Sequence, residues 1–276
     1  LGPGDGSLTK VLINTFKKFP QFNRATKIFL YEKSNFLKDI QRKKISNNKV
    51  NWIKNFDAIK KGPVIFFGNE FFDAIPIKQF SKNKNIYREK CYLVNKDGLQ
   101  EIYRKASLKD ISQIKKFRIL NNLTFIEYPK LGFLELDKIV KKISSLSGGI
   151  LLIDYGNLNN SNQNTLQSVM KNKRLSMNSI LKNLGRVDVT SLINFGLLKE
   201  YFRKKKLNVT KIVSQKYFLE KMGIIERAKI LQKKMNSTQL EYMSYTLMRL
   251  LHKNSMGELF KVVFAYKYKR KKFLGF

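Results

Sequence analysis

With 276 residues, of which 43% are hydrophobic, the chain is long enough to bury a substantial core in one large α/β domain, and this composition argues against wholesale disorder. The formal net charge is +35, but lysines are spread along the whole chain, so we interpret the charge as a solvated surface and expect no nucleic-acid partner. One cysteine, Cys91, excludes an internal disulfide, one histidine, His252, argues against a metal site, and no apolar run approaches the ~18 residues of a membrane helix.

The first part of the chain alternates between helical and strand-like segments. Glycines at Gly2, Gly4 and Gly6 form a turn, and the apolar residues that follow it, up to position 19, have helical spacing. The next segments predict a strand over 27–32 that ends at Glu32, a helix over 34–43, a strand over 49–53 around Trp52, and an apolar strand over 63–70.

Two additions interrupt this pattern in the second part of the chain. Alternating runs on both sides of a turn at 95–98 predict a β-hairpin, within an insertion at about 84–120. Residues 215–252 are mostly helical, with a break at Gly223, and predict a C-terminal helical addition. Around these additions we expect a helix over 136–147, a Gly-Gly break at 148–149, and a buried strand that ends at Asp154. A short strand over 165–170, a helix and then a strand over 193–214, and a long strand over 257–269 follow.

The alternation of strands with helical spacers predicts an α/β fold with a mostly parallel sheet and crossover helices. No linker is long enough to force two domains, so we interpret residues 1–276 as a single domain with two additions. In such a sheet, ligands bind at the carboxyl ends of the strands.

The opening turn has the composition of a cofactor site. Its spacing, G-x-G-x-G, is not the dinucleotide fingerprint G-x-G-x-x-G, because Ser7 stands where the third glycine is required, and no G-K-[ST] of a P-loop follows. Glycine lets the backbone approach a ligand closely, and this spacing suits S-adenosylmethionine, which has no pyrophosphate to bind. Glu32 ends the next strand, about 25 residues on, where a carboxylate can accept hydrogen bonds from ribose hydroxyls. Trp52 is either a wall of the adenine site or a core residue.

A second turn of unusual composition follows the apolar strand. Its sequence, GNEFFDAIPIKQF over 68–80, places two carboxylates and an aromatic pair directly after a buried segment. One interpretation is a surface loop that happens to hold two acids, and the other is the rim of an active site. Phe71 and Phe72 are more simply interpreted as core residues.

With both turns considered together, the chain resembles the MidA-type S-adenosylmethionine-dependent methyltransferases, whose mitochondrial members are arginine methyltransferases that assist the assembly of respiratory complex I. The matching segments follow the order of the family over nearly the whole chain: LGPGDGSL, FLYEKS, GNEFFDAIPIKQF, GGILLIDYG, VDVTSLINF and MGELFKV. The resemblance implies a class I Rossmann-like methyltransferase sheet. It also implies a strand that ends at Leu1, so we expect the domain to be incomplete at its N-terminus, with its first strand largely missing.

The resemblance also implies a cofactor and a partner. The cofactor is S-adenosyl-L-methionine, and the implied contacts are Gly2, Gly4, Gly6 and Glu32. The partner is a protein substrate with an acceptor arginine, such as a subunit of respiratory complex I. The implied location is the cytoplasm for a bacterial protein and the mitochondrial matrix for a eukaryotic one.

The acidic turn supplies the candidate catalytic residues for such a reaction. A guanidinium is positively charged, and carboxylates both bind it through paired hydrogen bonds and accept the proton that its nitrogen loses. We therefore assign Glu70 and Asp73 to the catalytic site. Asn69 is the candidate to donate a hydrogen bond to the cofactor or the acceptor.

Four further residues are candidates for substrate binding. Asp154 and Tyr155 end the strand that follows in the sheet, beside the acidic turn. Asp188 and Thr190 lie in the matching segment VDVTS and either line the acceptor cleft or cap a turn.

Other activities remain open at this point. A methyltransferase of RNA or of a small molecule has the same cofactor turn, although no aromatic and basic stripe of the RRM type is present. A non-catalytic assembly chaperone that keeps the cofactor fold as a docking module is the alternative from outside the enzymes.

Overall fold

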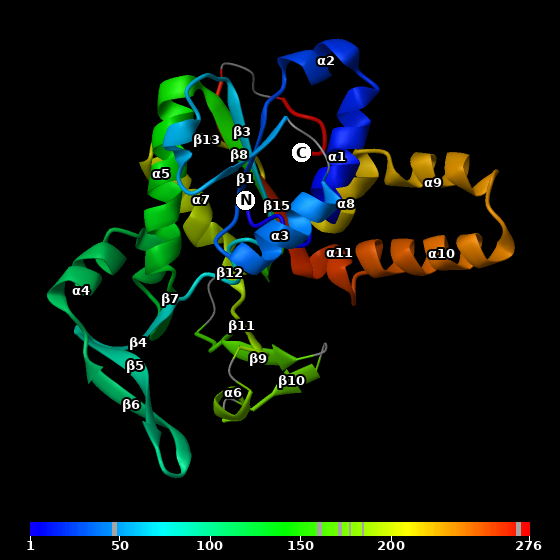
Figure 1. The fold of residues 1–276 in the computed structure, drawn as a ribbon. Helices are drawn as coiled ribbons and strands as arrows, with labels where there is room; N and C mark the ends of the chain where they lie inside the picture. Colours follow the sequence, from blue (N-terminus) through cyan, green and yellow to red (C-terminus); the bar gives the residue numbers. More distant parts are fainter. Residues whose placement is uncertain (46–48, 159–161, 171–172, 177, 184, 269–271) are drawn as a thin grey trace.

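In the computed structural model, the residues described are 1–45, 49–158, 162–170, 173–176, 178–183, 185–268 and 272–276. They form an α/β fold in which helices flank a central sheet, and three smaller units extend from this body (Figure 1). Among these residues, no helix is both long and apolar enough to span a membrane.

The central sheet is built around β8 (Gly148–Asn157), whose inner residues are almost completely buried. On one side β8 pairs in parallel with β3 (Val64–Asn69) and, at its end, with β12 (Ile193–Asn194). On the other side it pairs antiparallel with β15 (Phe260–Lys267), which in turn holds two short strands, β13 (Asn208–Val209) and β14 (Val213–Ser214). The final strand is antiparallel because it starts at the edge where β8 ends, with Phe260 opposite Tyr155.

A separate parallel pair lies beside β3. It consists of β1 (Ile28–Tyr31) and β2 (Val50–Ile53), as the sequence predicted. The first two residues of the chain connect this pair to the central sheet: the Leu1 nitrogen donates to the Phe67 carbonyl at 2.8 Å, and the Gly2 N–H donates to the Tyr31 carbonyl at 3.0 Å. The glycine turn therefore begins between the ends of β1 and β3.

Helices cover the sheet and carry most of its core. The two on one face, α5 (Lys130–Leu146) and α7 (Phe195–Lys204), lie next to each other against β8, and the rings of Phe133 and Tyr201 stack with centroids 4.4 Å apart (Figure 1). The remaining helical segments near the body are α1 (Ser7–Lys17), α2 (Pro20–Ala25), α3 (Asn35–Lys44), α4 (Leu108–Lys115) and the 3₁₀ turns η1 (Phe56–Ala58) and η2 (Arg118–Leu120).

The predicted hairpin is confirmed, and it belongs to a larger antiparallel sheet. The hairpin strands β5 (Ile86–Asn95) and β6 (Gly98–Lys105) are joined to β4 (Lys78–Asn83) and β7 (Phe125–Tyr128) in the order β6-β5-β4-β7. This sheet extends beyond the 84–120 expected for the insertion because Phe80 on β4 and Ile126 on β7 lie opposite each other and are completely buried. A buried base of this kind anchors the exposed hairpin to the body.

A second small unit lies between β8 and β12 in the chain. It holds β9 (Gln167–Met170), which confirms the strand predicted over 165–170, and two partners, β10 (Lys173–Leu175) and β11 (Asp188–Thr190), together with the short α6 (Ser179–Lys182). This unit brings β11 back toward the end of β8.

The third unit is the predicted helical addition. It comprises α8 (Gln215–Lys221), α9 (Ile224–Gln232), α10 (Ser237–Leu251) and α11 (Met256–Leu259), and Gly223 breaks it with a left-handed φ of 83°. A capping box of Asn236 and Gln239 starts α10. Helices α9 and α10 extend away from the body as an arm (Figure 1).

Candidate active site

All three glycines of the opening turn have a left-handed backbone conformation, but the atoms around them differ. Their φ values are 53° at Gly2, 55° at Gly4 and 83° at Gly6, which residues with a side chain adopt only with strain. A Cβ at Gly6 would lie 2.9 Å from Ile45 Cδ1, so this glycine allows α1 to pack closely on the segment after α3. A Cβ at Gly4 would meet no atom of the described residues within 4 Å, so Gly4 faces open space at the centre of the turn.

The carboxylate predicted to bind the ribose lies beside this turn. Glu32 directly follows β1, and its Oε1 accepts a hydrogen bond from the Ser34 N–H at 2.9 Å. Its other oxygen is 3.4 Å from the amide nitrogen of Gln41. The residue is half-buried, which leaves acceptor capacity for a ligand hydroxyl.

A glutamine that the sequence analysis did not identify joins these parts. Gln41 is completely buried, and its Nε2 donates to the Gly4 carbonyl at 2.7 Å. Its Oε1 accepts from Trp52 Nε1 at 2.9 Å. One side chain therefore fixes the glycine turn, the Glu32 carboxylate and the indole. The available signal was a polar residue on the inner face of the amphipathic helix α3, because a buried amide requires partners.

We expect Gln41→Leu to lower the affinity for S-adenosyl-L-methionine by about tenfold, since the turn and the indole both lose a buried hydrogen-bond partner. Calorimetric titration measures the affinity. Gln79→Leu is the matched control, because Gln79 is also buried and hydrogen-bonded, to Glu127 and Asn164 of the antiparallel sheet region. Equal affinity losses in both variants would show that Gln41 matters only for folding.

The acidic turn lies next to the glycine turn. Glu70 follows β3 with a φ of 48°, an uncommon conformation for a residue with a side chain, and its N–H donates to the Ile153 carbonyl at 3.0 Å. A Cβ at Gly2 would lie 3.3 Å from Phe71 Cδ2, so the ring of Phe71 packs directly on the glycine turn. The two turns thus face the same edge of the sheet, as the sequence predicted.

The second carboxylate of the turn is held inside a small polar cluster. Asp73 is 7% exposed, and its Oδ2 accepts a short hydrogen bond from the Tyr155 hydroxyl, which also interacts with the Thr190 hydroxyl. Its Oδ1 is buried and has no hydrogen-bond partner within the described segments. Asp188 is exposed on β11, and its charge acts on Asp73. The structure therefore brings the predicted residues of the acidic turn, β8 and β11 together.

Asp154 lies on β8 beside the acidic turn, as expected, and its side chain is buried. It is 1% exposed, its Oδ2 accepts from the Phe72 N–H at 3.0 Å and the Asp73 N–H at 3.4 Å, and its Oδ1 accepts from the Tyr155 N–H at 2.9 Å. Backbone donors surround both oxygens, and these contacts hold the acidic turn on the end of β8. A contact of Asp154 with the substrate stays a prediction.

The pKa values of the buried Asp154 and Asp73 and of the exposed Glu70 are all raised. Desolvation raises the pKa of Asp154 to about 8, with the charge of Asp73 as the next cause. Desolvation is also the largest cause that raises the pKa of Asp73, and the charge of Asp188 adds to it. The pKa of Glu70 is raised by desolvation and then by Asp73, while Arg249 acts in the opposite direction. Perturbed carboxyl groups that cluster at a strand end are typical of a functional site.

Comparisons with known proteins decide the family. A family model for S-adenosyl-L-methionine-dependent methyltransferases matches residues 1–213. The chain belongs to this family. It is 27% identical to a protein arginine methyltransferase NDUFAF7 homolog, mitochondrial, of Caenorhabditis elegans, over 82% of this chain and 57% of the relative, and 23% identical to the human NDUFAF7 protein, over 94% and 64%. The chain thus spans about 60% of the length of these curated relatives.

Solved structures confirm the predicted fold of this methyltransferase family member. A COG1565 superfamily protein of Burkholderia thailandensis matches 96% of the chain with a TM-score of 0.78 at 18% identity, covering 72% of that protein. A likely methyl transferase of the same superfamily and organism, bound to S-adenosyl-homocysteine, matches 99% of the chain with a TM-score of 0.76 at 18% identity, again over 72% of its length. Family and fold together confirm the resemblance and the cofactor that it implied.

The residues of the glycine turn fit the cofactor of the family. Gln41 contacts the Gly4 carbonyl, the Glu32 carboxylate and the partly buried Trp52, so the open space at Gly4 and the acceptor capacity of Glu32 lie near the indole. The guanidinium carbon of Arg42 lies 5.5 Å from the centroid of the Trp52 ring and covers one face of the indole. The cofactor residues predicted from the sequence are thus brought together, although their contacts with a ligand stay a prediction.

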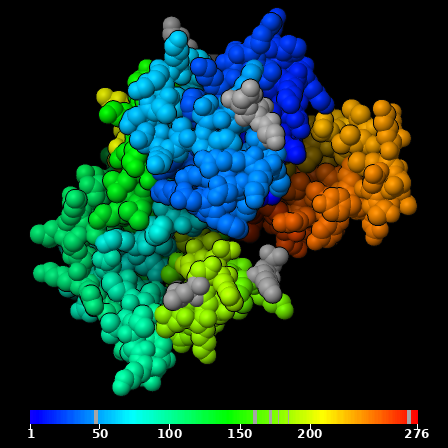
Figure 2. All heavy atoms as spheres, viewed as in Figure 1, coloured from blue at the N-terminus to red at the C-terminus, as the bar shows by residue number. Residues whose placement is uncertain are grey.

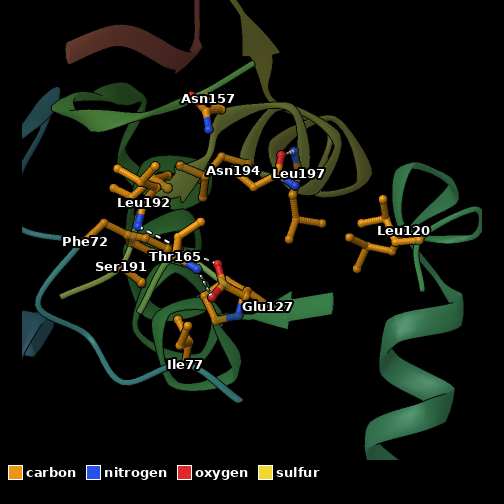
Figure 3. A pocket seen from close by; sticks show the side chains of 14 residues that line it. Phe72, Ile77, Leu120, Glu127, Asn157, Thr165, Ser191, Leu192, Asn194 and Leu197 are labelled. Atoms are coloured by element: carbon orange, nitrogen blue, oxygen red, sulfur yellow. Dashed lines mark hydrogen bonds between the residues drawn. The ribbon is translucent and has the colours of Figure 1, made fainter. Parts of the chain in front are cut away.

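A small cavity lies behind the acidic turn and is distinct from this cofactor cradle. It has a volume of about 50 Å³ and is lined by Phe72, Glu127, Thr165, Ser191, Leu192 and Asn194, among others (Figure 3). The Glu127 carboxylate accepts from the Thr165 N–H at 2.9 Å and from Gln79 Nε2 at 2.7 Å. None of the predicted cofactor or catalytic residues lines the cavity, and its volume is too small for a cofactor. Phe72 is a core residue here, packed against Gly132.

Proposed function

We propose that this protein transfers a methyl group from S-adenosyl-L-methionine to a guanidinium nitrogen of an arginine in a protein substrate. The observation that carries the proposal is the acidic turn itself, in which the exposed Glu70 lies close to Asp73, next to the glycine turn. Two carboxylates in one turn suit a guanidinium, which offers several N–H donors in a planar arrangement.

The residues of the acidic turn would position this acceptor. When bound, the cofactor supplies an electrophilic methyl group on a sulfonium. Glu70 and Asp73 would bind the guanidinium and offset its positive charge, so that one of its nitrogens is held in line with the methyl group. The nitrogen loses a proton on methylation, and a carboxylate with a raised pKa is suited to accept that proton near neutral pH.

The neighbouring residues would support these roles. Tyr155 donates to Asp73 Oδ2 and would hold that carboxylate in a fixed orientation. The Asp154 carboxylate holds the turn by accepting hydrogen bonds from the Phe72 and Asp73 N–H groups. Asn69 Nδ2 lies 3.4 Å from Glu70 Oε1 and would orient that carboxylate. Thr190 and Asp188 would line the acceptor side.

The relatives that match the chain are named as mitochondrial protein arginine methyltransferases, which supports a protein substrate. The proposed location is therefore the mitochondrial matrix for a eukaryotic protein and the cytoplasm for a bacterial one. A link to complex I assembly is part of this proposal. The alternative from outside the enzymes is a non-catalytic assembly chaperone that binds the cofactor. A biological role that survives Glu70→Gln combined with Asp73→Asn would favour the chaperone. Transfer of methyl label to RNA would favour an RNA methyltransferase.

The proposal predicts methylarginine that depends on the intact gene. Mass spectrometry of total protein from cells with and without the gene, together with labelled methyl transfer by the complete protein, is expected to show arginine methylation that disappears without it. An unchanged methylarginine pattern would contradict the proposal.

A further inference from the structure

The arm formed by α9 and α10 carries an exposed apolar stripe. Tyr242, Tyr245 and Met248 are 74%, 63% and 62% exposed, and their spacing of three residues places them on one side of α10. Ile230 on α9 is 67% exposed. Tyrosine and methionine are enriched in protein interfaces, and a row of large exposed apolar side chains on a projecting helix is typical of a docking surface. Figure 2 shows the arm standing clear of the body.

The root of this arm lies beside the candidate active site. Helix α10 contacts α8 and α11, and α11 leads directly into β15. The first residue of β15, Phe260, is opposite Tyr155, and the two rings are 5.5 Å apart. Arg249, one residue after Met248, is close enough to Glu70 to act on its pKa. The stripe therefore runs along α10 toward the acidic turn.

The charges of the arm select the kind of partner. Between residues 224 and 251, Lys and Arg outnumber Asp and Glu; the basic residues are Arg227, Lys229, Lys233, Lys234 and Arg249, and the acidic ones are Glu226 and Glu241. A second copy of the arm would be repelled by this excess of positive charge, whereas an acidic segment would be attracted. The acidic turn at the end of the stripe holds Glu70 and Asp73 and would instead attract a cation.

We propose that the Tyr242–Tyr245–Met248 stripe binds the polypeptide next to the acceptor arginine, and that this polypeptide is acidic and contains apolar side chains. The proposal rests on the proposed function, because it assigns the arginine to the acidic turn. The basic arm and the acidic turn together would favour the binding of an arginine that lies within an acidic segment over other arginines.

The test uses two synthetic peptides and one variant of the arm. Each peptide has a single arginine flanked by leucine and phenylalanine; the first carries aspartates, and the second has glutamines in their place. The variant combines Tyr242→Ser, Tyr245→Ser and Met248→Ser. The matched control combines Ile86→Ser with Val94→Ser on the β5–β6 hairpin, where the two side chains are 63% and 62% exposed. Fluorescence anisotropy in the presence of S-adenosyl-homocysteine measures peptide binding.

The wild type is expected to bind the aspartate peptide at least tenfold more tightly than the glutamine peptide. The arm variant is expected to lose at least tenfold in affinity for the aspartate peptide, while the hairpin control and the affinity for the cofactor stay unchanged. Equal binding of both peptides, equal binding by the arm variant, or a wild-type dimer that the arm variant abolishes in sedimentation would each overturn the proposal.

Kinetics separate this proposal from the proposed function. In the arm variant, KM for the aspartate peptide is expected to rise while kcat and methyl transfer to free arginine stay unchanged. If the wild type methylates neither peptide nor free arginine, the proposed function is wrong, and the binding comparison still decides whether the arm is a docking surface.

Discussion

Replacement of Asp73 with asparagine is expected to lower the rate of methyl transfer by about 100-fold or more, with little change in the affinity for S-adenosyl-L-methionine. Asparagine keeps the size of the side chain and can still accept from the Tyr155 hydroxyl. It removes the negative charge that would face the guanidinium and the oxygen that would receive its proton. Labelled methyl transfer to a peptide measures kcat, and calorimetry measures the cofactor affinity.

A matched control uses a carboxylate of the same type outside the site. Asp57 lies in η1 with its side chain 84% exposed, so Asp57→Asn is expected to leave the rate unchanged. If Asp73→Asn retains full activity, Asp73 does not act on the acceptor. If the cofactor affinity falls together with the rate, the acidic turn has a structural role in the cradle.

The raised pKa values add a pH dependence to this result. Desolvation raises the pKa of Asp73 and of Glu70, so both carboxyl groups gain their charge at a higher pH than carboxyl groups in water. Activity that requires their ionised forms should therefore fall, on acidification, at a pH above the ordinary carboxyl range. Arg249 acts against the shift at Glu70, so its removal should move the acidic limb further upward.

The sequence was sufficient to predict the parts of the site that depend on the backbone. Three glycines at a spacing of two predicted a turn, and the structure has a turn in which all three have positive φ. The strand that ends before Glu32 and the apolar strand that ends at Asn69 were predicted from hydrophobic patterns that local structure determines.

Hydrophobic patterns could not predict which side chains meet when they are far apart in the sequence. Tyr155 and Asp73 are 82 positions apart, and Gln41 and Gly4 are 37 apart, so no local spacing indicates that they meet. Asp154 was assigned to the substrate because it ends a strand at the ligand edge, but its contacts with the backbone of the acidic turn depend on how that turn folds over β8. The base of the antiparallel sheet was missed for the same reason, since β4 pairs with β7 across the whole hairpin.

The site is built from two turns that hold each other in place. The ring of Phe71 packs on Gly2, the nitrogen of Leu1 donates to Phe67, and the uncommon conformation of Glu70 is fixed by its hydrogen bond to β8. Strain of this kind persists only where surrounding contacts support it, and it is concentrated at functional sites. A change in the glycine turn should therefore affect the ligand more than the fold, provided that its side chain points into open space.

Gly4→Val tests this argument and is expected to lower the affinity for S-adenosyl-L-methionine by more than about 100-fold, which corresponds to about 2.8 kcal/mol. A Cβ at Gly4 meets nothing within 4 Å in the described chain, so the branched side chain would occupy the space that we assign to the ligand. Gly185→Val is the matched control, because Gly185 also has a positive φ, of 75°, and open space at its Cβ. Both variants carry similar backbone strain, about 1–2 kcal/mol, so thermal unfolding should shift by similar amounts. Calorimetry that shows the same cofactor affinity for Gly4→Val and the wild type would place the ligand elsewhere.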